Sequence, residues 1–212
     1  MKYSFRALPE NPDAQVRSTL RQVIGYMRED AQSPFIQAEA AKLHELGGGD
    51  PNVGLYRMLK RDVRFKRDEK IAEDLPGDDP RKRDTIEVLI RPIDQWLLIK
   101  LRGLGIGDCD CIHMYGGCLL HALGIPCSLV TVAADPSAPE DFSHVYLASY
   151  WNGVRTPLDI SHGEYPGWEC PNLGRLREWP VEVTRSEILI GTGIALGTLT
   201  AIYFGLELFR KA

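Results

Sequence analysis

The stretch from residue 107 to residue 158 constrains the fold more than any other part of this chain. It opens with an apolar segment, residues 109–123, whose hydrophobic residues recur at helical spacing, with Asp108 placed to cap its first turn and Gly124 to end it. Three segments rich in β-branched and aromatic residues follow at 128–133, 143–150 and 154–158, and the turn-forming pair Asn152-Gly153 joins the last two. A buried helix followed by antiparallel strands predicts an α+β domain.

The residues before this stretch predict a helical region. A capping residue followed by proline occurs three times within residues 1–64, and this pattern predicts three helices, at Asn11-Pro12, Ser33-Pro34 and Asp50-Pro51. Residues 65–84 are strongly charged and contain proline and glycine breakers, so a solvated loop is expected there. The core domain is expected over residues 85–182, beginning with a β-rich segment at 86–90 and a helix that Pro92 opens.

The carboxy-terminal tail is strongly apolar. Residues 188–206 contain no charged side chain, and as a helix, at roughly 1.5 Å per residue, they would be about as long as a bilayer is thick. We therefore expect a hydrophobic, transmembrane helix over 187–209 and a membrane-associated protein. The glycines at 191, 193, 197 and 205 leave the alternative of a buried helix that packs closely in an assembly.

Composition excludes some classes of protein. The formal net charge is -4, with acidic and basic residues mixed, so nothing indicates a nucleic-acid partner. The number of cysteines is five, and four of them lie between residues 109 and 127. An odd, crowded set of this kind is not a disulfide framework and instead favours a catalytic or metal-binding role.

Cys109 is the candidate nucleophile. A cysteine in the first turn of a helix faces unpaired amides and the positive end of the helix dipole, which stabilise a thiolate. His144 begins the second predicted strand, where an inward-facing imidazole would reach a helix packed on the sheet. Asp159 follows one hairpin later, and strand pairing would bring its carboxylate to the other ring nitrogen of His144. The sequence therefore predicts a catalytic triad of Cys109, His144 and Asp159.

The run GDCDCIHMYGGCLLHALGIPC, residues 107–127, resembles the signature of bacterial and phage transglutaminase-like cysteine peptidase domains. In that family a glycine-aspartate-cysteine-aspartate turn opens the nucleophile helix, and a leucine-glycine-isoleucine-proline turn closes it. The segments FSHVYL and TPLDIS resemble the histidine and aspartate strands of the family. Other segments resemble a subgroup encoded by tailed phages and prophages, namely VRFKRD, EVLIRPIDQW and YPGWECP. The resemblance extends over residues 13–180.

The resemblance implies a papain-like, transglutaminase-like core in which Cys109 is the nucleophile, His144 the base and Asp159 the orienting carboxylate. It implies an amide hydrolase or acyltransferase that works through a thioester, uses no cofactor or metal, and acts on a peptide or peptidoglycan-like substrate. A phage or prophage origin would make phage particle proteins possible partners and would place the chain in a virion or at a membrane.

One position departs from the family pattern. Cys111 stands where a second aspartate is usual, and because residues two apart on a helix point in different directions, Cys111 is not expected to share the role of Cys109. The backbone amide of Cys109 is expected to donate to the oxyanion. Gln95 and Trp96 are the candidates for the second donor.

Two alternatives to the enzyme remain open. The first is a structural zinc site, although the spacing of the candidate ligands matches no common zinc motif: Cys109, Cys111, His113, Cys118, His121 and Cys127. The second is a non-catalytic virion or membrane-anchored structural protein that keeps the fold.

The remaining histidines and tryptophans have plainer expected roles. His113 and His121 are expected at the surface or half-buried on their helix, and His162 in a solvated loop. The three tryptophans of the last third are expected in the core, with a substrate groove as the alternative: Trp151, Trp168 and Trp179.

Overall fold

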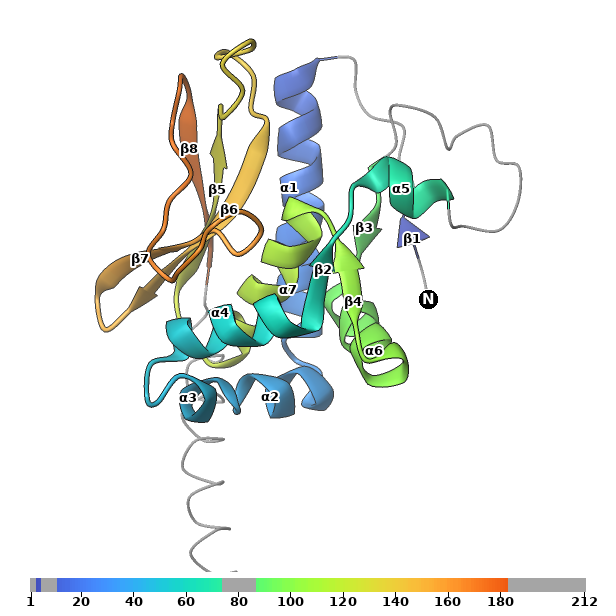
Figure 1. The fold of residues 1–212 in the computed structure, drawn as a ribbon, viewed down its shortest axis with the longest axis vertical. Coiled ribbons are helices and arrows are strands. Elements are labelled where there is room, and N and C mark those ends of the chain that lie inside the picture. The colour runs from blue at the N-terminus through green and yellow to red at the C-terminus, as the bar shows by residue number, and fades with distance from the viewer. Residues whose placement is uncertain (1–2, 5–10, 74–86, 183–212) are drawn as a thin grey trace, which may run out of the picture.

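A computed structural model describes residues 3–4, 11–73 and 87–182 and shows a helical half followed by an antiparallel sheet (Figure 1). The helical half contains α1 (Pro12–Asp30), α2 (Pro34–Ala40), α3 (Leu43–Leu46) and α4 (Pro51–Asp62). The three proline-led starts are confirmed, and the side chains of Asn11 and Asp50 accept amide hydrogen bonds as caps, whereas Ser33 makes no such bond. The second predicted helix is divided, because the chain turns after Ala40 before α3 begins.

The segment predicted as a charged loop contains regular structure. Strand β2 (Val63–Phe65) is followed by α5 (Asp68–Glu73), in which Ile71 is buried in a small cluster with Val88 and Leu98. The prediction of a solvated loop is therefore wrong for residues 68–73, because one apolar side chain suffices to dock this short helix. Residues 74–84 lie outside the described part of the chain.

Two short strand pairs lead the chain to its central helix. Strand β1 (Tyr3–Ser4) pairs antiparallel with β3 (Leu89–Ile90), and after α6 (Pro92–Arg102) strand β4 (Gly105–Gly107) pairs parallel with β2. Gly107 must be glycine, because a Cβ atom there would lie 2.5 Å from Cβ of Cys111. Strand β4 is therefore followed directly by Asp108 and the start of α7.

The second half is the predicted helix and sheet. Helix α7 (Cys109–Ala122) is followed by β5 (Cys127–Val132), β6 (His144–Trp151), β7 (Val154–Leu158) and β8 (Leu176–Val181). The strands form one antiparallel sheet in the order β7-β6-β5-β8. Asn152 and Gly153 both have positive φ, 52° and 74°, as the predicted tight hairpin requires. Strand β8 was not predicted.

Helix α7 lies at the centre of the molecule, between the sheet on one side and α6 with the β2-β4 pair on the other (Figure 1). Residues 110–121 are all buried, as expected for a helix covered on every side. One face of the sheet packs on α7 through Val145 and Leu147, while the other carries a separate cluster that includes Tyr146 and Ala148. The two faces of β6 therefore pack in different clusters of the protein.

The predicted hydrophobic helix over 187–209 lies outside the described residues and stays a prediction. Within the described ranges, no helix has both the length and the apolar character needed to cross a membrane.

Candidate active site

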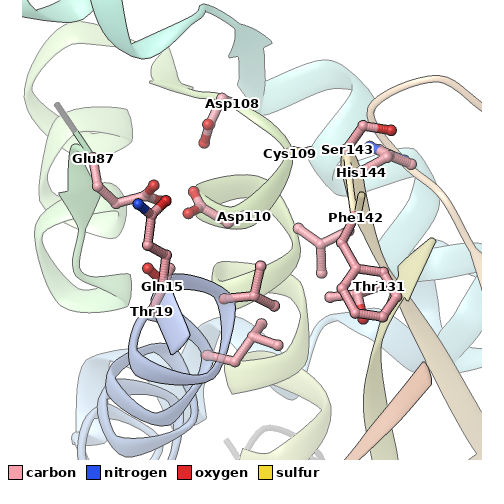
Figure 2. A pocket seen from close by; sticks show the side chains of 13 residues that line it. Gln15, Thr19, Glu87, Asp108, Cys109, Asp110, Thr131, Phe142, Ser143 and His144 are labelled. Atoms are coloured by element: carbon pink, nitrogen blue, oxygen red, sulfur yellow. The ribbon is translucent and has the colours of Figure 1, made fainter. Parts of the chain in front are cut away.

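Cys109 is the first residue of α7, as predicted. The side chain of Asp108 caps the helix by accepting the N–H of Cys111 at 3.4 Å. Cys109 is half-buried and borders an open cavity of about 260 Å³ that is lined mainly by α1, the start of α7 and the residues around the start of β6. In Figure 2, Asp108 and Asp110 lie on one side of this cavity, and Ser143 and His144 lie on the other. The nucleophile candidate and the base candidate therefore face one space.

The electrostatics of the Cys109 thiol differ from the sequence-based expectation. Burial raises the pKa of Cys109 above its ordinary value, and the charge of Asp108 raises it further, while the backbone N–H of Val145 acts in the opposite direction. The same aspartate that caps the helix thus offsets the helix dipole. This direction is opposite to the stabilised thiolate that the sequence predicts for Cys109.

His144 and Asp159 form a buried pair. The ring atom Nε2 of His144 and Oδ2 of Asp159 are 2.7 Å apart, and both side chains are buried. Although burial opposes ionisation of Asp159, the hydrogen bond from His144 and the N–H of His162 hold the pKa of Asp159 below its ordinary value. An ionised carboxylate only accepts hydrogen bonds, so Nε2 of His144 carries the proton and Nδ1 is the basic nitrogen.

The imidazole of His144 reaches the central helix, as predicted, although its strand position alone would not direct it there. By strand alternation His144 shares a face with Tyr146, whose ring is stacked at 6.2 Å, and not with Val145, which packs toward α7. Because His144 is the first residue of β6, it lies at the rim of the sheet, and its ring centroid is 6.3 Å from that of His113 on α7. Cys109 and His144 share a cavity, but the two described side chains form no hydrogen bond with each other.

His113 links the two halves of the site, a role that the sequence reasoning missed. It was expected at the surface or half-buried, yet it is fully buried. Its Nε2 accepts the N–H of Ile160 at 3.0 Å, so Nδ1 carries the proton and donates to the carbonyl oxygen of Cys109 at 2.6 Å. Burial lowers the pKa of His113 to about 4, in agreement with this neutral form. The imidazole therefore ties the start of α7 to the residue that follows Asp159.

The loop after β7 holds the aspartate in place. The second carboxylate oxygen of Asp159 accepts from Oγ of Ser161 at 2.9 Å and from the N–H of His162 at 3.1 Å. Gly163 closes this turn by donating to the carbonyl of Asp159 at 2.7 Å, and a Cβ atom at position 163 would lie 2.4 Å from that oxygen. His162 is exposed but packs edge-on against His144 with a centroid distance of 4.6 Å. It is part of the site and not only a solvated loop residue.

The six residues considered as zinc ligands do not converge among the described residues. The thiol of Cys111 is held between two backbone groups of β3 and its neighbour, donating to the carbonyl of Val88 and accepting the N–H of Ile90, both at 3.2 Å. His113 is engaged as described above, and Cys127 is buried on β5, 3.9 Å from the carbonyl of Gly117. Cys111 thus links α7 to β3 and the residue before it.

The two candidates for the second oxyanion donor are not at the cavity. Gln95 is fully buried beside Gly105, and Trp96 stacks on Phe35 at 4.8 Å. The side-chain amide that borders the cavity belongs to Gln15 of α1, which Figure 2 shows directed toward Glu87 and Asp110. Nothing in the local sequence around Gln15 distinguishes it, because its position depends on how α1 packs beside α7.

The three tryptophans are separated from one another. Trp151 packs on His44 at 5.4 Å, and Trp179 donates to Oγ1 of Thr131 at 2.9 Å. Only Trp168 borders a cavity next to the site, which it shares with His144 and Cys170. A groove lined by all three is therefore not present in the described structure.

Comparisons with known proteins give one distant structural likeness and no family assignment. The chain matches no protein-family model and no curated protein. Among solved structures, it is similar to a protein from Cytophaga hutchinsonii that is provisionally assigned as a cysteine protease, with 16% identity, a TM-score of 0.39, and coverage of 74% of this chain and 53% of that one. This chain thus spans about half of that protein's length, and a likeness at this level carries no argument about chemistry.

Proposed function

We propose that this protein is a cysteine-nucleophile amide hydrolase or acyltransferase with a transglutaminase-like core. The observation that carries the proposal is the 2.7 Å hydrogen bond between the buried His144 and Asp159, beside the cavity that Cys109 borders at the start of α7. A thiol at a helix start, an imidazole and a carboxylate that fixes its tautomer are the three parts of a cysteine triad.

Each part has a defined step in this mechanism. The sulfur of Cys109 attacks the substrate carbonyl while Nδ1 of His144 takes the thiol proton, and the backbone N–H of Cys109 donates to the oxyanion. His144 then gives its proton to the leaving amine, and a thioester remains. Water or an amine attacks the thioester and restores the thiol, with His144 again carrying the proton. Asp159 stabilises the imidazolium in both halves of the reaction.

The raised pKa of Cys109 favours one order of proton transfer and nucleophilic attack. Because the resting thiol is protonated, proton transfer accompanies the attack instead of preceding it. Cys109 and His144 must then come within hydrogen-bond reach in the substrate complex, where catalytic hydrogen bonds commonly tighten.

The acidic side of the cavity bears on the choice of substrate. Glu87, Asp108 and Asp110 gather there (Figure 2). Burial and the charge of Asp108 raise the pKa of Asp110, so Glu87 and Asp108 supply the negative charge that favours a positively charged group on the ligand. We therefore favour a peptide or peptidoglycan-like substrate with a free amine. Phage or prophage origin, and membrane attachment through residues 187–209, are proposals that rest on the sequence resemblance and on the apolar tail.

A substrate panel with two matched cysteine variants tests the proposal. Release of the amine from peptides and peptidoglycan fragments, and transfer to an added amine, are measured for the unmodified protein, Cys109→Ala and Cys170→Ala. We expect activity in the unmodified protein and in Cys170→Ala, and loss of at least about 10³-fold in Cys109→Ala. Full activity of Cys109→Ala would contradict the proposal, and inactivity of every form with every substrate would favour the non-catalytic structural protein.

A further inference from the structure

A second cavity lies on the other side of His144. It has a volume of about 420 Å³ and is bordered by His144, His162, Trp168 and Cys170, among others. A ring nitrogen of His144, a carboxylate oxygen of Asp159 and the sulfur of Cys170 all lie within 4.8 Å of one another. Cys170 is half-buried in the irregular segment between β7 and β8. The proposed mechanism uses His144 and Asp159 but gives no role to this thiol.

We propose that His144, Asp159 and Cys170 form a binding site for zinc or a similar thiophilic divalent cation, and that metal bound there inhibits the enzyme. The inhibitory part rests on the function proposed above, whereas metal binding does not. Imidazole nitrogen, carboxylate oxygen and thiolate sulfur are the three ligand types that zinc takes in proteins. This mixed set favours zinc over calcium or magnesium, which prefer oxygen ligands alone.

Binding of zinc requires only small movements of the three ligand atoms. Zinc bonds of about 2.0–2.3 Å in tetrahedral arrangement place ligand atoms roughly 3.3–3.6 Å apart. From the upper limit of 4.8 Å, Cys170 must therefore approach by roughly 1.2–1.5 Å, and its place in an irregular segment permits this. The 2.7 Å contact between His144 and Asp159 must widen by roughly 0.6 Å, so the metal replaces their hydrogen bond. A fourth position is left for water or for His162, which borders the same cavity.

Metal bound at this site would inhibit the enzyme because His144 would lose its basic nitrogen. The thiol of Cys170 releases its proton to solvent when the sulfur binds the metal. Metal on Nδ1 of His144 occupies the lone pair that the mechanism needs, and metal on Nε2 shifts the ring proton to Nδ1. In either case His144 no longer accepts the proton of Cys109.

Cobalt(II) provides a test of binding that does not depend on activity. Co²⁺ is titrated into the full-length protein, into Cys170→Ser and, as a matched control, into Cys118→Ala, which removes a buried thiol remote from the cluster. The expected result is a thiolate-to-cobalt charge-transfer band at one equivalent in the unmodified protein and in Cys118→Ala. That band should be absent in Cys170→Ser. A missing band in the unmodified protein, or an equal band in Cys170→Ser, would overturn the site.

Inhibition by Zn²⁺ is measured separately on a substrate that the protein turns over. Cys170→Ser should keep its activity without metal, while the Zn²⁺ concentration for half-inhibition should rise by at least about 10-fold. Unchanged inhibition of Cys170→Ser would overturn the inhibitory role, because the metal would then act through Cys109. If no substrate is found, the failure belongs to the proposed function, and the cobalt result still decides the metal site.

Discussion

The buried imidazole of His113 should make the stability of the protein depend on pH. In the folded protein His113 is neutral, accepts the N–H of Ile160 and donates to the carbonyl of Cys109. Burial lowers its pKa from 6.5 to about 4. An unfolded chain protonates this residue near pH 6.5, whereas the folded chain resists protonation until about pH 4. Stability due to His113 is therefore complete above pH 6.5 and is lost as the pH falls toward 4.

The size of the effect follows from the pKa difference. A pKa lowered from 6.5 to about 4 corresponds to about 3 kcal/mol in total, at about 1.4 kcal/mol per pKa unit. Between pH 7 and about pH 4.5, about 2.4 kcal/mol of this should be lost. The variant His113→Gln can still offer an oxygen to the N–H of Ile160 but has no titratable ring, so it should lose this part of the pH dependence.

Urea unfolding of the unmodified protein and of His113→Gln, each at both pH values, measures this quantity. The free energy of unfolding should fall by about 2.4 kcal/mol more in the unmodified protein than in the variant, and titrating groups that do not interact with His113 cancel in the comparison. His113→Leu, which leaves the N–H of Ile160 buried and unpaired, should cost about 1–3 kcal/mol at pH 7. Equal pH dependence in the unmodified protein and His113→Gln would refute the reasoning.

Three further predictions concern the neighbouring residues. Asp159→Asn should fold normally but turn over substrate about 10²–10⁴-fold more slowly, because the tautomer of His144 is no longer fixed; a normal kcat would be incompatible with the triad. Alkylation of Cys109 by iodoacetamide, mapped by peptide mass, should accelerate about tenfold per pH unit from pH 7 to 9, since the pKa of this thiol is raised; a rate already constant at pH 7 would show a stabilised thiolate. Cys111→Ala should lower the free energy of unfolding by about 1–3 kcal/mol, because Val88 and Ile90 lose the thiol between them; an unchanged urea midpoint would argue against that link.

Features fixed by neighbouring residues could be predicted from the sequence. The proline-led helix starts, the Asp108 cap and the Asn152-Gly153 hairpin each depend on a few consecutive side chains, and all are present. The pairing of His144 with Asp159 could also be predicted. A tight hairpin fixes the register of β6, which begins with His144, and of β7, which Asp159 directly follows.

Features fixed by distant residues could not be predicted in the same way. Strand β8 contains Arg177, Glu178 and Pro180, a composition typical of a loop, and it becomes a strand only by pairing with the exposed edge of β5. The burial of His113 depends on the N–H of Ile160, which the fold brings to it from the segment after β7, 47 residues further along the chain. The thiol of Cys170 comes to His144 along an irregular segment that has no periodic pattern to follow.

Acylation of Cys109 by an activated ester tests the proposed triad directly and requires no knowledge of the natural substrate. The full-length protein and His144→Ala are mixed with p-nitrophenyl acetate, release of nitrophenol is followed, and the acylated residue is identified by peptide mass. The proposed triad predicts one acyl group per chain, on the sulfur of Cys109, with a rate at least about 10-fold lower in His144→Ala. Acylation of Cys170 in place of Cys109, or an equal rate in His144→Ala, would contradict it.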